Sequence, residues 1–134
     1  MGSIDTIHGL GHRNATKLRK HGIRTTESLL KACHDRKGRR QFAAETGFDE
    51  SQLLTWVNRA EMMRVKGIGE EYAGLLEAVG VDTVGALRRR NPANLLQRMV
   101  DANGKRRRVR RLPTEAMVAR WVEEAGNLDP LVAS

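Results

Sequence analysis

The feature that most constrains the fold of this 134-residue chain is a stretch that occurs twice, 58 residues apart. Residues 4–29 read IDTIHGLGHRNATKLRKHGIRTTESL, and residues 62–87 read MMRVKGIGEEYAGLLEAVGVDTVGAL. Each copy has two apolar residues three positions apart, then Gly-apolar-Gly, an Ala, a Leu, a Gly and a Thr. A repeat of this regularity predicts two copies of one supersecondary unit.

The aligned positions are those that a packed helical unit needs. The pairs are Ile4 with Met62, Ile7 with Val65, Gly9 with Gly67, Gly11 with Gly69, Ala15 with Ala73, Leu18 with Leu76, Gly22 with Gly80, Ile23 with Val81, Thr25 with Thr83 and Leu29 with Leu87. The apolar residues three positions apart predict a short helix with one buried stripe. The Gly-apolar-Gly segment predicts a tight loop whose central residue, Leu10 or Ile68, points into the core. A second helix follows, and a glycine ends it.

The rest of the chain also reads as helices. Residues 36–47 predict a helix that stops at Gly47, and Asp49 predicts an N-cap with Gln52 in the capping-box position. Residues 92–102 predict a helix closed by Asn103-Gly104, and a last helix opens after Pro113. No segment alternates as a strand does, so we expect an all-α fold. Residues 128–134 read as a frayed tail.

The domain division follows from the repeat. We expect a first repeat over residues 1–61 and a second over residues 62–134, packed as one compact unit. The helix after residue 49 runs on into residues 62–65 in this prediction, so the two repeats share a central helix. Trp121 matches Trp56 at a separation of 65 rather than 58 residues, which indicates an insertion of about seven residues in the second repeat. The basic segment 105–111 is the obvious candidate.

At these residues the chain resembles the helix-hairpin-helix motif, whose pattern is apolar-x-x-apolar-x-Gly-apolar-Gly-x-x-x-Ala-x-x-apolar. The residues that fill it are Ile4, Ile7, Gly9, Leu10, Gly11, Ala15 and Leu18, and again Met62, Val65, Gly67, Ile68, Gly69, Ala73 and Leu76. Over nearly its whole length the chain is similar to an uncharacterised bacterial and archaeal family of tandem helix-hairpin-helix repeats. The resemblance implies SAM-like helical repeats and binding of DNA through backbone phosphates without sequence specificity. It also implies, for some members, a monovalent cation held by hairpin carbonyls, and for others a purely structural joint.

The two copies of the repeat differ in the charges that follow their loops. The formal net charge is +8 and the sequence pI is about 10.5, which favours a polyanionic partner. The first loop is followed by His12 and Arg13, and Arg13, Lys17 and Lys20 share one helix face. The second loop is followed instead by two glutamates. The unit therefore folds with either charge pattern, and the basic face is not needed for packing.

We therefore predict a phosphate-binding site at the first loop, where backbone N–H groups at a helix N-terminus are backed by cations. Its residues are Gly9, Leu10, Gly11, His12, Arg13, Lys17 and Lys20, with Lys105, Arg106, Arg107 and Arg108 as a secondary basic arm. The second loop, with Lys66, Gly67 and Gly69, is predicted to bind phosphate more weakly because Glu70 and Glu71 lie beside it. The alternative is that the basic stripe is a solvated helix face.

Catalytic and metal-binding chemistry finds little support. The spacing of Cys33-His34 relative to the other histidines matches no zinc pattern, so no metal site is expected. No triad, phosphate loop or acidic nuclease set is recognisable, so we expect no enzymatic activity. No apolar run reaches 18 residues and no secretory signal is visible. These features predict a cytoplasmic protein, associated with the nucleoid if it binds DNA, with no membrane partner.

The sequence thus predicts a nucleic-acid-binding module that grips backbone phosphates, with DNA favoured over RNA by the resemblance. No cofactor is expected apart from a monovalent cation at a hairpin. The alternative is a protein–protein adaptor in which the second repeat, with its acidic loop and Tyr72, binds a protein partner. Steep salt dependence of polyanion binding would distinguish the two.

Overall fold

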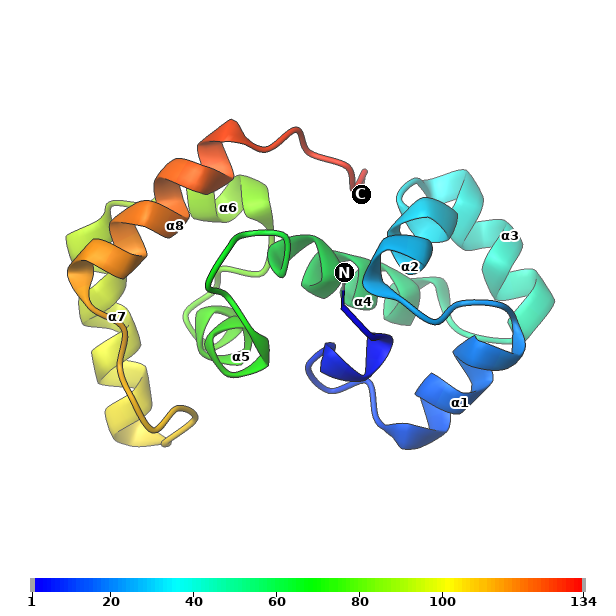
Figure 1. Ribbon diagram of the computed structural model, residues 1–134, viewed down its shortest axis with the longest axis horizontal. Helices are drawn as coiled ribbons and strands as arrows, with labels where there is room; N and C mark the ends of the chain where they lie inside the picture. The colour runs from blue at the N-terminus through cyan, green and yellow to red at the C-terminus, as the bar shows by residue number, and fades with distance from the viewer. Residues whose placement is uncertain (1, 134) are drawn as a thin grey trace. The chain divides into compact units, whose positions relative to one another are not determined.

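The computed structural model describes residues 2–133, and its regular structure is helical (Figure 1). The described residues contain one 3-10 helix, eight α-helices and no strand beyond an isolated bridge between Ser3 and Thr25. In chain order the helices are η1 (Ile4–Thr6), α1 (His12–Lys20), α2 (Thr26–Cys33), α3 (Arg36–Thr46), α4 (Glu50–Met62), α5 (Glu70–Ala78), α6 (Val84–Arg88), α7 (Pro92–Lys105) and α8 (Glu115–Asn127). The expected all-α fold is confirmed.

The helices form two units. The first comprises Met1–Glu61 together with Pro130–Ser134, and the second comprises Met62–Asp129. In the first unit α2 packs against α3, and in the second α8 packs against α6 and α7 while α5 packs against α7. Residues 1 and 134, the outer ends of the two expected repeats, lie outside the described residues. The segment 130–133, which we expected to fray at the end of the second repeat, returns instead to the first unit.

Each unit has its own hydrophobic core, built from the repeat positions. All six apolar pairs of the repeat, including Leu18 with Leu76, are buried in both units, and Trp56 and Trp121 are buried as well. Leu10 and Ile68, the central residues of the Gly-apolar-Gly segments, are 2% and 3% exposed. Burial of an aliphatic side chain of this size stabilises by about 1.5–3 kcal/mol, so the repeated positions account for much of each core.

Equivalent hydrogen bonds are found at the start and at the end of both copies of the repeat. Ile7 N–H donates to Ile4 O at 3.0 Å, and Val65 N–H donates to Met62 O at 3.1 Å. This three-residue turn ends α4 at Met62, so the prediction that the helix continues to Val65 was wrong. After α1 and α5, the amides of Ile23 and Val81 each donate across six residues at 2.9 Å to the carbonyls of Leu18 and Leu76. Both helices therefore end in the same glycine-containing C-terminal motif.

Side-chain caps fix most of the other helix starts. Thr25 forms a capping box with Ser28, and Thr114 accepts a hydrogen bond from the amide of Met117 at 3.1 Å. Asn91 caps α7, which begins at Pro92. The predicted stop at Asn103-Gly104 was wrong, since α7 continues to Lys105. The side chain of Asn103 accepts hydrogen bonds from the amides of Arg108 and Val109 in the loop that follows, and so does not break the helix.

Candidate nucleic-acid interface

The first glycine loop, residues 8–11, brings the chain into the N-terminus of α1. Gly9 and Gly11 have φ of 75° and 81°, a region that residues with a Cβ rarely adopt. Leu10 is buried between them, its N–H donates to the carbonyl of Ile7 at 3.2 Å, and its carbonyl accepts from Nδ2 of Asn14 at 2.9 Å, so Leu10 holds the loop to the core and does not face a ligand. Gly11 is the N-cap of α1 and no side chain caps this end of the helix. The exposed first turn therefore presents backbone N–H groups and the positive end of the helix dipole to solvent.

A guanidinium group supports this loop from within the first unit. Arg59, on α4, donates through Nη1 to the carbonyl of His8. A Cβ placed on Gly9 would lie 2.8 Å from the same Nη1 atom, so the glycine leaves room for the arginine. The carbonyl of His8 is thus bound by a positively charged side chain of the protein itself.

A basic groove follows directly along α1. It has a volume of about 550 Å³ and is lined by His12, Arg13, Thr16, Lys17, Lys20 and His21. The structure therefore brings together the four charged and histidine residues that the sequence predicted for this site, and it adds Thr16 and His21. Five of the six side chains carry a positive charge or a titratable imidazole, and no carboxylate lines the groove.

Two aromatic side chains, Phe42 within α3 and Phe48 after the end of that helix, hold the groove in place. The Nζ atom of Lys17 lies 4.6 Å from the centre of the Phe48 ring, a cation–π contact that leaves Lys17 half-buried. The imidazole of His21 meets the ring of Phe42 edge-on, with centroids 6.1 Å apart. Lys17 is therefore partly a packing residue, whereas Arg13 and Lys20 are exposed.

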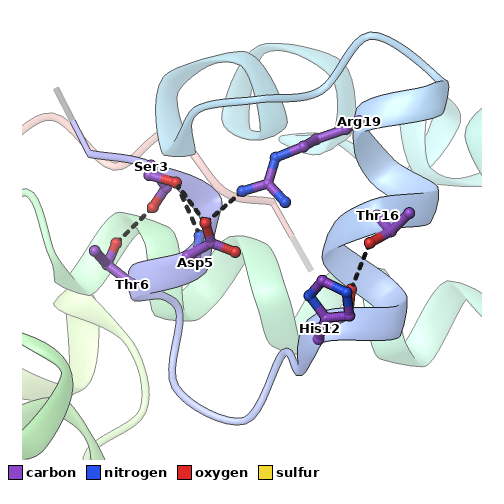
Figure 2. A network of polar contacts seen from close by, with 6 residues as sticks. All are labelled: Ser3, Asp5, Thr6, His12, Thr16 and Arg19. Carbon is purple, nitrogen blue, oxygen red and sulfur yellow. Dashed lines mark hydrogen bonds and ion pairs between the residues drawn. The ribbon is translucent and has the colours of Figure 1, made fainter.

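On the other face of α1, the positive charge of Arg19 is neutralised by a carboxylate. Arg19 forms an ion pair with Asp5 of η1, and the Ser3 hydroxyl also contacts Asp5 (Figure 2). On the groove side, Thr16 donates its hydroxyl hydrogen within the helix, to the carbonyl of His12 at 2.9 Å (Figure 2). The free cations of α1 are thus concentrated on the groove side.

The second glycine loop, residues 66–69, differs in backbone as well as in charge. Gly67 has φ of 91°, but Gly69 has φ of −98° and ψ of −168°, which is ordinary extended backbone. A Cβ on Gly67 would lie 3.1 Å from Nε1 of Trp121, so the indole stands close to this loop. The helix that follows, α5, begins with Glu70 and Glu71 in its uncapped first turn.

The basic segment 105–111 is a fixed loop of the second unit rather than a free arm. Val109 is buried, and Oδ1 of Asn103 accepts hydrogen bonds from the amides of Arg108 and Val109 at 2.8 and 3.1 Å. The Tyr72 hydroxyl donates to the carbonyl of Arg111 at 2.9 Å. Lys105 is the last residue of α7 and Arg106 is its C-cap, and Lys105, Arg106, Arg107 and Arg108 are all exposed.

Anchoring of this loop places the last two arginines of the basic segment 105–111 beside the second glycine loop. A groove of about 410 Å³ at the second loop is lined by Gly67, Gly69, Glu70, Glu71, Tyr72, Arg110 and Arg111. Arg110 and Arg111 therefore share a groove with the two glutamates. Lys66 is exposed but does not line it. The hydrogen bond of Tyr72 with Arg111, which joins residues 39 positions apart, brings the end of this segment to the second loop, and no local sequence pattern indicates that contact.

Residues 2–133 contain neither a metal-binding cluster nor a membrane-spanning helix. In that range no three or more His, Cys, Asp or Glu side chains gather in a way that could hold a metal ion. Within the same range no helix has the length and apolar character that crossing a bilayer requires.

The fold and the two grooves define a small, basic, all-helical protein made of two related units. The chain belongs to the DUF4332 family, described as a domain of unknown function, whose pattern matches residues 8–128. No curated protein and no solved structure significantly matches the chain.

Proposed function

We propose that this protein binds nucleic acid through backbone phosphates at the first glycine loop and the basic groove of α1. The observation that carries the proposal is the groove itself, which continues from an uncapped helix N-terminus and is lined by cationic side chains without a carboxylate. Backbone N–H groups at a helix start and adjacent cations together form a favourable site for phosphate.

The two units support a tandem helix-hairpin-helix interpretation. In each, a short helical turn, a glycine loop with a buried central residue and a second helix follow one another in the same order. This arrangement, together with the motif resemblance, favours DNA over RNA. Backbone amides and cationic side chains contact phosphates, which position the protein on the nucleic acid but carry no sequence information. We therefore expect binding that does not depend on sequence.

The salt dependence of binding provides the test. If Arg13, Lys17 and Lys20 each neutralise one phosphate of a duplex, the slope of log affinity against log salt is about −2 to −3. We would measure fluorescence anisotropy with labelled duplex DNA, single-stranded DNA and RNA of one sequence, across a salt series. Duplex DNA is expected to bind most tightly.

The structure selects the variant to compare. Arg13→Glu/Lys20→Glu reverses two exposed charges and spares Lys17, which packs on Phe48. The matched control is Arg36→Glu/Lys37→Glu, which changes the net charge equally at two exposed positions of α3 that do not line the groove. We expect the first variant to lose at least about tenfold in affinity and about two units of slope, and the control to stay within about threefold.

Equal losses in the two variants would mean that only net charge matters, and the assignment to the groove would be wrong. Absence of wild-type binding to all three nucleic acids near physiological salt would reject the proposed function itself. A folded state for each variant would be verified by circular dichroism.

The second candidate function is a protein–protein adaptor that uses the second unit. The groove at the second glycine loop favours it, because Glu70 and Glu71 share that groove with Arg110 and Arg111. Mixed charges suit a peptide with both signs better than a polyphosphate. Tyr72 is less available to a protein partner than its sequence position implied. Its hydroxyl is hydrogen-bonded to the carbonyl of Arg111, and its ring packs on Trp121 with centroids 5.2 Å apart.

A further inference from the structure

The segment after α8 has no regular secondary structure, and its residues 131–133 make a specific set of contacts within the first unit. The amides of Leu131 and Val132 donate to one carboxylate oxygen of Glu61 at 2.7 and 2.9 Å. The amide of Ala133 donates to the carbonyl of His34 at 2.8 Å, and the carbonyl of Ala133 accepts from Nη2 of Arg39. Three consecutive amides and one carbonyl are therefore paired.

The charged groups that make these contacts are buried. Glu61 and Arg39 are each only 3% exposed. Glu61 lies in the last turn of α4, where the helix dipole disfavours a carboxylate, and burial adds a desolvation cost. The two amides of the segment supply charge-assisted hydrogen bonds that offset both terms. A carboxylate at this place is thus explained by the segment that it binds.

Arg39 has a comparable dual role. Its Nη1 donates to the carbonyls of Cys33 and His34, each at 3.0 Å, at the C-terminus of α2. Its Nη2 remains directed to the segment through Ala133. The guanidinium therefore both caps a helix and presents a fixed donor to the backbone of the segment, a use for which its planar fork is suited.

The segment itself adds little apolar burial. Val132 packs against the core of the first unit, but Leu131 is 42% exposed and Pro130 and Ala133 are exposed too. Contacts directed to backbone groups, with one half-buried side chain, give modest stability. Segments with few buried apolar contacts open at a low free-energy cost.

We propose that Glu61, Arg39 and the carbonyl of His34 form a receptor for the backbone of a short peptide segment, and that residues 130–133 occupy it as a strap that detaches and rebinds. The ligand class is a short non-helical segment with free N–H groups at three consecutive positions, the first two of which converge on one carboxylate oxygen, and a small apolar side chain at the middle one. Proline is excluded at those three positions because each amide donates a hydrogen bond.

Amide hydrogen exchange on the full-length chain tests the strap. We expect the amides of Leu131 and Val132 to exchange at least about tenfold more slowly than in the free peptide LDPLVAS, since hydrogen bonds to charged groups are the strong ones, and the amide of Ala133, bonded to the neutral carbonyl of His34, to be protected less. Glu61→Met, which removes the acceptor at similar volume, should abolish the protection at Leu131 and Val132. Glu61→Gln keeps a neutral acceptor and should give intermediate protection.

A full-length variant that cannot dock its own strap tests the receptor. Leu131→Pro/Val132→Pro removes two of the three donors, and labelled LDPLVAS is then added and followed by fluorescence anisotropy. We expect this variant to bind the peptide at least about tenfold more tightly than wild type, whose receptor is occupied. A control peptide that carries the same two prolines should not bind.

The proposal is overturned if the wild-type amides exchange as they do in the free peptide, or if Glu61→Met leaves their protection unchanged. Equal binding of the two peptides by the proline variant would also overturn it. If Glu61→Met does not fold, the wild-type exchange rates and the proline variant still decide the question.

Discussion

Glu124 accepts a hydrogen bond from the backbone amide of Lys66 at 3.1 Å, at the position where the first unit has Arg59 donating to the carbonyl of His8. Glu124 follows Arg59 by 65 residues, the same separation as between Trp121 and Trp56. One position on the last helix of each unit therefore contacts one position of each glycine loop, with the opposite charge. The first loop gains a cation from this contact and the second a carboxylate.

This inversion predicts different consequences for the two side chains. Arg59→Met leaves a partly buried carbonyl without its donor, and we expect it to lower the free energy of unfolding by about 1–3 kcal/mol. Glu124→Gln keeps an acceptor for the Lys66 amide and should lower the free energy of unfolding by less than about 1 kcal/mol. Urea denaturation of both variants measures the difference. A larger loss for Glu124→Gln would show that the second contact, rather than the first, secures its loop.

Alanine substitutions at three loop glycines should change the free energy of unfolding by different amounts in the two copies of the repeat. Gly9→Ala meets both a positive φ and the Nη1 atom of Arg59, so we expect a loss of about 2–4 kcal/mol. Gly11→Ala has open space but a φ of 81°, and should cost about 1–2 kcal/mol. Gly69→Ala has neither problem, and its effect should lie within about 0.5 kcal/mol of zero or be slightly stabilising.

Thermal unfolding monitored by circular dichroism would rank these three variants. The pair Gly11 and Gly69 is the informative one, because the two residues are aligned in the repeat but differ in φ. Equal costs at both positions would mean that Gly69 also needs the left-handed region in solution.

Local signals in the sequence were sufficient for most of the fold. The glycine repeat, the helix start at Pro92 and the stop at Gly47 each depend on a few neighbouring residues, and the structure has them where they were expected. The groove of α1 was predictable for a similar reason. Residues separated by three or four positions share a helix face whatever the rest of the chain does.

Contacts between residues far apart in the sequence were not predictable in this way. The terminal segment reads as a frayed tail because its partners, such as Glu61, lie some 70 residues away. Arg110 and Arg111 reach the second loop only because Tyr72 and Asn103 fix the connector. The ion pair of Arg19 with Asp5 likewise removes from the site a cation that sequence alone leaves free.

The two lysines of the groove should respond differently to truncation. Lys17→Ala removes the cation–π contact with Phe48 as well as a charge, and we expect a loss of about 0.5–1 kcal/mol in stability together with weaker polyanion binding. Lys20→Ala removes an exposed charge and should weaken binding with almost no change in stability. Parallel denaturation and anisotropy measurements on both variants check this. Equal stabilities would show that the contact of Lys17 with Phe48 contributes nothing in solution.

Cys33 provides a prediction that depends on pH. Burial raises the pKa of its thiol from 9.0 to about 11, although the nearby Arg39 guanidinium lowers it in part, and Asp35 raises it. The unfolded chain therefore loses this proton near pH 9 while the folded chain keeps it until near pH 11. Over that window the folded state binds more protons, so the contribution of Cys33 to stability is constant below pH 9 and becomes less favourable as the pH rises to 11.

Reactivity of the thiol follows from the same shift. At pH 8 the folded protein should contain roughly a hundredfold less thiolate than the unfolded chain, because two pKa units separate the states. A disulfide exchange reagent should then label Cys33 slowly in buffer and rapidly in concentrated urea. The labelling rate in buffer should increase in variants that destabilise the first unit, such as Gly9→Ala, and stay unchanged in Gly69→Ala. Rapid labelling of the wild-type protein in buffer would mean that this core opens frequently and that the thiol is not sequestered.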